Sequence, residues 1–371
     1  MTMPTSSSRV AIVHDFMRVF GGAERVLKEL HDIYPQAPIY TLLADPSMVA
    51  EHFPRAEIHT SSLQKSWLRH RQQFLLPFLP AAIEEFDFNA YDTVISSSGA
   101  YAHGVITGPD TQHICYCHSP MRYAWDWHAE YLSEHGVKSV SALAAASTIM
   151  NRVRTWDYVA SKRVDVWLAN SGTVSKRIAK FYGQPSQIIY PPVDTQFFSP
   201  GDDISPLPKP YVITVSRLSR YKRIDLLIEA CHSVKLPLVI VGGGEDAAAL
   251  KRAASGKDVT FTGRIDDTAL RRYLQHARAY VTAVEEDFGI APVEALSLGV
   301  PVVALGVGGV TETVVDGVNG RLFALPSVDS LTDALLRLDS LSTIPADIRR
   351  SAGQYSRQAF QTAIRNVVDH A

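Results

Sequence analysis

The first half of the chain contains short apolar runs, and each run ends in a polar or glycine-containing turn. Runs of this length and composition are typical of strands buried in a parallel sheet. Apolar residues at helical spacing follow several of them, as at Val26, Leu27 and Leu30. Strands that alternate with helices indicate an α/β fold. The strands predicted in this half span residues 10–13, 39–43, 56–59, 92–95, 112–117 and 165–170, and residues 188–190 are predicted to end the first domain.

The same alternation begins again after residue 210. The segment before it, 191–210, is rich in Pro, Gly and Asp, which is typical of a stiff linker. A chain of 371 residues is long enough for two cores. We therefore predict two α/β domains, 1–195 and 196–351, and a helical C-terminal segment, 352–371. The strands predicted in the second domain span residues 211–215, 238–241, 259–262 and 279–283.

Composition narrows the class of protein. The formal net charge is −2, with 36 basic and 38 acidic residues, which argues against a protein built mainly to bind nucleic acid. The three cysteines form no disulfide framework, and the run Cys115-Tyr-Cys117-His118 lacks the second ligand pair of a metal site. The polar N-terminus and the absence of a long apolar run predict a cytoplasmic protein with at most peripheral membrane contact.

Two carboxylates, Glu286 and Glu294, follow the predicted strand 279–283 and flank a Phe-Gly turn. Pro292 suits the first position of a helix and Gly299 the position just past its end, so we expect Glu294 in the first helical turn. Ligands of open α/β sheets bind at the carboxyl ends of the strands. The pair suits binding of sugar or ribose hydroxyls, although spacing alone is equally compatible with a solvated acidic loop.

Cations gather after the predicted strand 211–215, at Arg217, Arg220, Lys222 and Arg223. They precede a predicted helix, where positive charge is mildly unfavourable unless an anion is bound. An arginine fork beside a lysine point charge suits a diphosphate, so Arg217 and Lys222 are expected to converge on one anion. The alternative is a pair of ordinary surface cations.

In the first half, Gly21 and Gly22 lie between a strand and a helix, where backbone N–H groups can approach a phosphate. A simple turn is the alternative. His118 comes directly after the predicted strand 112–117 and is expected at the same ligand edge, or else as a structural histidine. Segment 64–80 interleaves basic and aromatic residues, which predicts either contact with an anionic membrane surface or a core-facing helix with a basic edge.

Several of these motifs resemble a known family. The run from Glu286 to Glu294, with the glycine-rich segments at 299–303 and 308–320, resembles the E-x7-E region of retaining GT4-family glycosyltransferases. The run from His118 to Asp126 resembles the H-[ST]-P-x-R-Y-x-W-D segment of members that often use GDP-mannose. The resemblance covers nearly the whole chain.

The resemblance implies the GT-B fold, with two facing Rossmann-like domains, a ligand cleft between them and the segment 352–371 packed back on the first domain. It implies that His118 and Glu286 are catalytic, that Glu294 holds the ribose and that Arg122 contacts acceptor or phosphate. The donor-binding residues it implies are Gly21, Gly22, Arg217, Lys222, Arg264, Glu286, Phe288, Gly289, Ile290 and Glu294.

The expected reaction is a retaining transfer of mannose from GDP-mannose, a nucleotide-sugar donor, to a lipid-linked glycan acceptor. The leaving diphosphate, stabilised by Arg217 and Lys222, would help deprotonate the acceptor hydroxyl. No Asp-x-Asp triplet occurs in the sequence, so we expect no metal and no cofactor. A UDP-sugar donor, a nucleotide-sugar epimerase of the same fold and a catalytically silent nucleotide-sugar binding protein are the alternatives.

Overall fold

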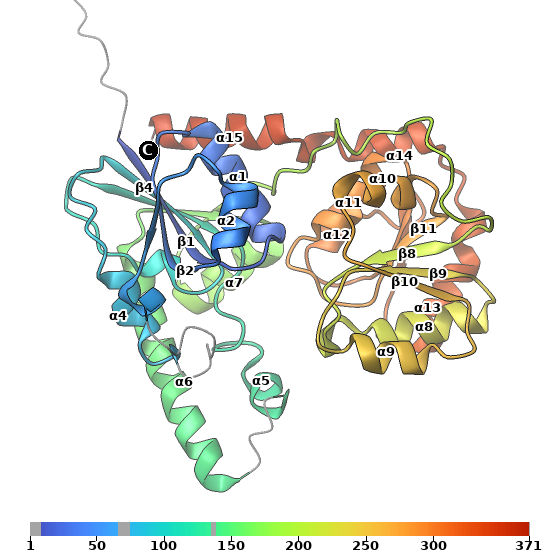
Figure 1. Ribbon diagram of the computed structural model, residues 1–371, viewed down its shortest axis with the longest axis horizontal. Helices are drawn as coiled ribbons and strands as arrows, with labels where there is room; N and C mark the ends of the chain where they lie inside the picture. Colours follow the sequence, from blue (N-terminus) through green and yellow to red (C-terminus); the bar gives the residue numbers. More distant parts are fainter. Residues whose placement is uncertain (1–8, 66–74, 135–138, 371) are drawn as a thin grey trace, which may run out of the picture. The chain divides into compact units, whose positions relative to one another are not determined.

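The computed structural model describes residues 9–65, 75–134 and 139–370. The chain divides into two compact units, Met1–Pro192 with Phe360–Ala371, and Val193–Ala359 (Figure 1). The first crossing therefore lies three residues before the predicted limit at 195, and the second lies eight residues after the predicted limit at 351. The reason is that the Val193 N–H donates to the Tyr355 carbonyl, 2.8 Å away, which ties the start of the linker to the second unit.

The first unit contains a seven-stranded parallel sheet of order β3-β2-β1-β4-β5-β6-β7. The central strand β1 is four residues longer than predicted. His14 continues its pairing with both neighbouring strands, and Phe16 continues its pairing with β2. Register places His14 opposite Ser97. The strands are β1 (Val10–Met17), β2 (Ile39–Ala44), β3 (Ile58–Thr60), β4 (Thr93–Ser98), β5 (Gln112–Cys117), β6 (Val166–Ala169) and β7 (Gln187–Ile188).

Several helices of the first unit bury apolar residues against its sheet. Helix α1 buries Val26, Leu27 and Leu30, which lie on one helical face, as the sequence predicts. Helix α15 adds Phe360 and Ile364 to the same core cluster. The helices are α1 (Gly22–Ile33), α2 (Pro46–His52), α4 (Leu79–Glu84), α5 (His128–Glu134), α6 (Val140–Ala160), α7 (Gly172–Tyr182) and α15 (Arg357–His370).

The second unit contains a six-stranded parallel sheet of order β10-β9-β8-β11-β12-β13. In Figure 1, α10 and α11 lie on one face of this sheet and α8, α9 and α13 on the other. Its strands are β8 (Val212–Val215), β9 (Leu238–Val241), β10 (Val259–Gly263), β11 (Ala279–Thr282), β12 (Val302–Leu305) and β13 (Gly320–Phe323). Its helices are α8 (Ile224–Ser233), α9 (Ala247–Ala253), α10 (Asp267–Gln275), α11 (Ile290–Ser297), α12 (Val310–Thr313), α13 (Val328–Leu336) and α14 (Pro345–Ser351).

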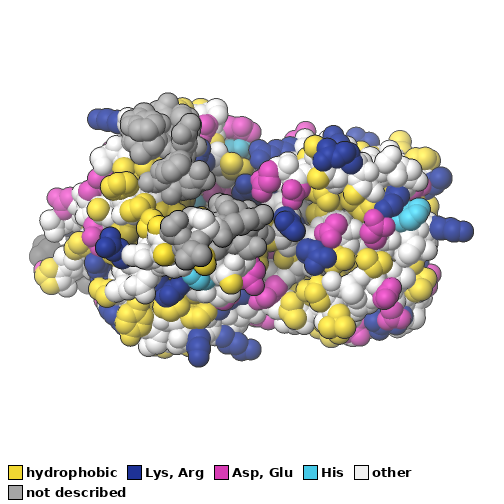
Figure 2. Space-filling model, turned by 90° about the horizontal axis from the view of Figure 1, so that it is seen from below, with side chains coloured by type: hydrophobic (Ala, Val, Ile, Leu, Met, Phe, Trp, Pro, Cys, Tyr) yellow, Lys and Arg dark blue, Asp and Glu magenta, His cyan; other side chains and the backbone are white. Residues whose placement is uncertain are grey.

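The cysteines of the first unit lie in its core, and its surface carries charges of both signs (Figure 2). Cys115 and Cys117 are buried side chains of β5, and no group of residues in the described ranges could hold a metal ion. On the face shown in Figure 2, acidic and basic side chains are interspersed. Most of the basic-aromatic segment 64–80 (residues 66–74) lies outside the described residues, so its membrane contact stays a prediction. Within the described part of the chain, no helix is long and apolar enough to cross a membrane.

Candidate functional site

The loop that carries Glu286 follows β11, at the carboxyl edge of the second sheet. The backbone after β12 packs directly on it: Gly309 N–H donates to the Glu286 carbonyl at 2.8 Å. A Cβ atom on Gly308 would lie 2.5 Å from that carbonyl oxygen, and one on Gly309 would lie 2.6 Å from the Cα of Phe288. Only glycine permits this approach, so the two glycines fix the position of the loop.

Glu286 and Lys222 form the central ion pair of this edge. Lys222 comes from a 3-10 turn after β8, and its Nζ lies 2.7 Å from Glu286 Oε1. The side chains are only 16% and 23% exposed. Burial alone would lower the pKa of Lys222, but the negative charge of Glu286, with Tyr221 and Asp287, raises it overall. Lys222 is therefore a permanent cation, and the structure brings together two residues predicted as donor-binding.

The helix that carries Glu294 begins earlier than predicted. Gly289, at φ 90°, precedes the first turn, and α11 starts at Ile290. Pro292 is therefore the third helical residue and Glu294 the fifth, so the predicted placement of Glu294 in the first turn is wrong. The predicted end is confirmed, because Gly299 follows the helix with φ 80°.

Glu294 is nonetheless part of the same edge. Its residue is 4% exposed. Tyr280, the second residue of β11, donates its hydroxyl to the Val215 carbonyl at 3.3 Å. Burial raises the pKa of Tyr280, and the negative charges of Glu286 and Glu294 raise it further. Both carboxylates therefore lie near one tyrosine, in surroundings of low polarity.

The other predicted donor-binding residues are more dispersed. Arg217 does not converge with Lys222 in this structure, because it pairs with Glu245 at 3.4 Å. These side chains are 70% and 62% exposed, and such surface pairs contribute little to stability. Arg264 follows β10, the strand that pairs with β9 at the edge of the same sheet. Phe288 is buried against Tyr355, with ring centroids 5.5 Å apart, so only its backbone could contact a ligand.

The first unit carries a second polar cluster at its strand ends. Ser97 Oγ, on β4, lies 3.1 Å from His14 Nδ1 and 2.8 Å from His118 Nε2. His118 follows β5, as predicted, and its backbone is held by hydrogen bonds to Ser98 and Asn170. The residue is partly exposed, but burial of the ring and the neighbouring His14 lower its pKa to about 3. His118 is therefore neutral at physiological pH.

Three residues of this cluster were missed from the sequence. Asp15 accepts hydrogen bonds from the N–H groups of Gly99, Tyr101 and Ala102 at 2.6–2.7 Å, which fixes the loop after β4. His14 and Ser97 are the others. The signal for His14 and Asp15 is a polar dipeptide directly after the predicted strand 10–13, and Ser97 lies in a run of three serines after the predicted strand 92–95.

The glycine loop of the first unit is satisfied internally. The Gly21 N–H donates to Glu24 Oε2 at 2.9 Å, which caps helix α1. Gly22 is the first helical residue. Gly21 therefore bonds to its own helix in this structure, and a phosphate contact by either glycine stays a prediction.

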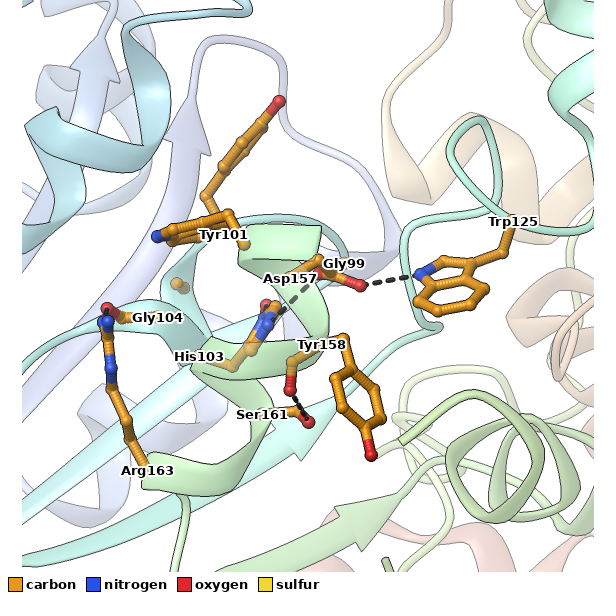
Figure 3. Close-up of polar contacts among 12 residues, drawn as sticks. Gly99, Tyr101, His103, Gly104, Trp125, Asp157, Tyr158, Ser161 and Arg163 are labelled. Carbon is orange, nitrogen blue, oxygen red and sulfur yellow. Dashed lines mark hydrogen bonds and ion pairs between the residues drawn. The ribbon is translucent and has the colours of Figure 1, made fainter. Parts of the chain in front are cut away.

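Arg122 lies in the loop between β5 and α5. Its guanidinium stacks on Trp127, 4.0 Å from the ring centroid, and its Nε lies 3.6 Å from the Asp126 carboxylate. The same loop is anchored through Trp125, which donates to Asp157 of α6 at 2.7 Å. Figure 3 shows His103 and Trp125 both pointing at this buried carboxylate. The anchor holds the segment on which Arg122 lies.

Buried histidines predict loss of stability in acid. His113 on β5 bonds Ser96 Oγ through Nε2 at 2.8 Å, and burial, with His103 nearby, lowers its pKa to about 3. The unfolded value is about 6.5, so the unfolded chain binds more protons between pH ~3 and ~6.5. The contribution of each such histidine to the free energy of unfolding is fully present above pH ~6.5. It falls as the pH is lowered, by up to about 1.4 kcal/mol per pH unit.

We expect His113→Gln to flatten this decline, since the variant removes one titrating group. Urea unfolding at several pH values measures it, followed by tryptophan fluorescence, because all five tryptophans precede residue 193 and so report on the first unit. His59→Gln, at a partly exposed histidine, is the matched control. An equal decline with pH in His113→Gln and in the unsubstituted protein would contradict the prediction.

Comparison with known proteins gives two family matches that together span most of the chain. Residues 20–197 match the model "Glycosyltransferase Family 4", and residues 200–359 match "Glycosyl transferases group 1". A GDP-mannose-dependent alpha-(1-6)-phosphatidylinositol monomannoside mannosyltransferase of Mycolicibacterium smegmatis is 32% identical over 57% of this chain and 59% of its own. A D-inositol 3-phosphate glycosyltransferase of Kribbella flavida is 32% identical over 46% and 47%. The chain thus spans about half the length of the curated relatives it matches.

Solved structures show the same fold. Anabaena HepE, in complex with UDP and glucose, aligns with a TM-score of 0.69 at 19% identity, over 98% of this chain and 100% of its own. Sucrose-phosphate synthase from Thermosynechococcus elongatus aligns with a TM-score of 0.74 at 18% identity, over 97% and 98%. At these identities the likeness extends to the fold and no further.

Proposed function

Because the chain belongs to the family 4 glycosyltransferases of the GT-B fold class, we propose that it transfers a sugar from a nucleotide diphosphate donor to a hydroxyl acceptor. The observation that carries the proposal is the Lys222–Glu286 pair beside the buried Glu294. A permanent cation suits a diphosphate, and carboxylates suit hydroxyls. One sheet edge thus offers the chemistry that a nucleotide sugar needs.

In the proposed reaction, Lys222 and Arg217 stabilise the negative charge that develops on the leaving diphosphate. Glu286 binds a hydroxyl of the transferred sugar, and Glu294 binds the ribose. The bond from the anomeric carbon to the diphosphate oxygen breaks, the acceptor oxygen bonds to the same face of that carbon, and the acceptor proton passes to the leaving phosphate. The product retains the anomeric configuration. No covalent intermediate on the enzyme is needed.

The proposed donor is GDP-mannose and the proposed acceptor a lipid-linked glycan. The run from His118 to Asp126 supports this, as do the mannosyltransferase relatives, whose names include GDP-mannose and a phosphatidylinositol glycolipid. Arg122, anchored through its loop, is the proposed acceptor contact, and segment 64–80 is proposed to meet the anionic surface in which a lipid acceptor lies. UDP-sugars are the competing donors, since HepE was solved with UDP-glucose.

The test of the proposed function is a panel of GDP- and UDP-sugars read by thermal shift. The best ligand is then assayed for transfer with a membrane lipid extract as the source of acceptor. We expect stabilisation by GDP-mannose and a mannosylated lipid product. Conversion of the sugar nucleotide to an epimer without acceptor would instead support an epimerase, and binding without turnover would support a silent binding protein.

Arg217→Ala and Lys222→Ala are each expected to weaken binding of free nucleoside diphosphate. Loss of a charge-assisted contact costs roughly 1.5–3 kcal/mol, or about tenfold or more in affinity. Titration calorimetry measures it. Arg223→Ala, which removes an exposed cation paired with Asp225, is the matched control and should change little. Unchanged affinity in both of the first two variants would refute the assignment.

Turnover is expected to survive EDTA. The sequence has no Asp-x-Asp triplet, and cationic side chains take the place of a metal at the proposed diphosphate site. Initial rates with and without chelator measure this, with added Mg²⁺ as the paired control. Loss of turnover in EDTA that Mg²⁺ or Mn²⁺ restores would show that the proposed mechanism is wrong.

A further inference from the structure

A line of polar groups crosses the strand ends of the first unit. Glu24 Oε1, on α1, faces His14 Nε2, on β1, at 3.6 Å, an electrostatic contact slightly longer than a hydrogen bond. His14 Nδ1 lies 3.1 Å from Ser97 Oγ, which in turn lies 2.8 Å from His118 Nε2. His14 and Ser97 are buried, whereas His118 is partly exposed. The line therefore runs from a carboxylate through buried groups to His118, a residue that is partly exposed.

Counting protons along this line gives one preferred arrangement. An ionised carboxylate only accepts hydrogen bonds, so Glu24 favours the His14 tautomer with its proton on Nε2. His14 Nδ1 is then an acceptor, and the Ser97 hydroxyl donates to it. Ser97 has no second proton, so its oxygen accepts from Nε2–H of His118. A neutral imidazole carries one proton, which leaves the lone pair on His118 Nδ1.

We propose that Glu24, His14 and Ser97 are positioning residues that fix the tautomer of His118 and present its Nδ1 as a hydrogen-bond acceptor. The proposal rests on the proposed sugar transfer and names the chemistry that His118 recognises there. A nitrogen with a lone pair accepts from a hydroxyl but cannot donate to a phosphate oxygen. His118 therefore recognises a hydroxyl group, which in the proposed transfer is one of the transferred sugar, and not a phosphate oxygen.

Glu24→Gln tests the proposal because it should reverse the donor and acceptor roles along the line from residue 24 to His118. The two carboxylate oxygens have separate partners, Gly21 N–H and His14. In Glu24→Gln the amide oxygen can keep the Gly21 contact while the amide N–H donates to His14 Nε2. The His14 proton then moves to Nδ1 and bonds the Ser97 oxygen, so the Ser97 hydroxyl donates to His118 Nε2. The proton of His118 is left on Nδ1.

The readout is ¹⁵N NMR of the whole protein labelled at histidine, at neutral pH, because the two ring nitrogens of each tautomer differ in chemical shift. His118→Gln assigns the His118 signals by their disappearance. We expect Nε2–H in the unsubstituted protein, Nδ1–H in Glu24→Gln, and a mixture of both in Ser97→Ala. Asp32→Asn, which removes another carboxylate from α1 away from the described contacts of His14, should keep Nε2–H.

Kinetics supply a second readout. Glu24→Gln and Ser97→Ala should each lower kcat/KM for the sugar donor about tenfold. They should leave the Kd of free GDP or UDP unchanged, since a free nucleotide lacks the transferred sugar. The proposal would be overturned if His118 carried its proton on Nδ1 in the unsubstituted protein, or kept it on Nε2 in Glu24→Gln. If circular dichroism shows that Glu24→Gln does not fold, the decisive variant is Ser97→Ala. A His118 signal from the Nε2–H tautomer alone in that variant would overturn the proposal. The NMR outcome does not depend on turnover, so failure of the sugar transfer is recognised separately.

Discussion

Glu286→Gln is expected to lower kcat roughly 10²–10³-fold, the usual effect of removing one preorganised group that acts in the transition state. It should leave the Kd of free nucleoside diphosphate nearly unchanged. Glu286 contacts the transferred sugar in the proposed site, and a free nucleoside diphosphate lacks that sugar. Glutamine keeps a carbonyl oxygen that Lys222 Nζ can reach, so the lysine stays in place to bind phosphate. Single-turnover rates and nucleotide titrations measure the two quantities separately.

Glu294→Gln is the matched variant. It should weaken nucleotide and nucleotide-sugar binding together, about tenfold, because both ligands carry ribose. Since Glu294 lies in the second helical turn, beyond the reach of the helix dipole, any change in its melting temperature reports on burial of the side chain. Equal increases in the nucleotide Kd in both variants would show that the two carboxylates do not have separate roles.

Gly309→Ala is expected to destabilise the second unit and to abolish most turnover. The added Cβ would lie 2.6 Å from the Cα of Phe288 and inside van der Waals contact with the Asp287 carbonyl. Both neighbours are backbone, so no rotamer change relieves the clash, and overpacking of this kind costs about 1–3 kcal/mol or more. The loop that holds Glu286 must move.

The control for this variant lies in the same unit. A Cβ on Gly353 would meet no atom within 4 Å, so Gly353→Ala should behave like the unsubstituted protein. Thermal unfolding and initial rates compare the two variants. If Gly309→Ala matches Gly353→Ala in both, the close backbone approach after β12 does not position Glu286.

The fold was largely predictable from the sequence because each buried parallel strand is a short apolar run. Strands β5 and β9 match the predicted ranges 112–117 and 238–241. The central strand β1 was predicted too short because polar His14 and Asp15 continue it. Their polarity is offset by hydrogen bonds to Ser97 and to the loop after β4, which only the paired sheet reveals.

The start of α11 could not be predicted from Pro292. The first turn of any helix leaves its N–H groups unpaired, so proline is tolerated at the third position as well as the first. The positive φ of Gly289 turns the chain into the helix two residues before the proline. Local propensity was therefore compatible with either start, and the glycine conformation decided between them.

The parts of the site that depend on the order of strand ends were predictable from the sequence. The ion-pair and hydrogen-bond partners of individual side chains were not. Lys222 and Glu286 meet because β8 and β11 are neighbours in the sheet. Arg217 has Glu245 as an alternative partner of opposite charge, and nothing in its spacing to Lys222 excludes that. The contact of Ser97 with His14 and His118 depends on the register of β1 against β4.

Because helix α15 belongs to the core of the first unit, that unit can complete folding only after the C-terminal end of the chain is synthesised. The first unit obtains Phe360 and Ile364 from this helix, so its core is drawn from both sides of the second unit in the sequence. A ribosome makes residues 360–370 only after the whole of Val193–Ala359. The second unit, which is continuous, can therefore complete its core during translation, while the nascent first unit must wait for a helix made more than 160 residues later.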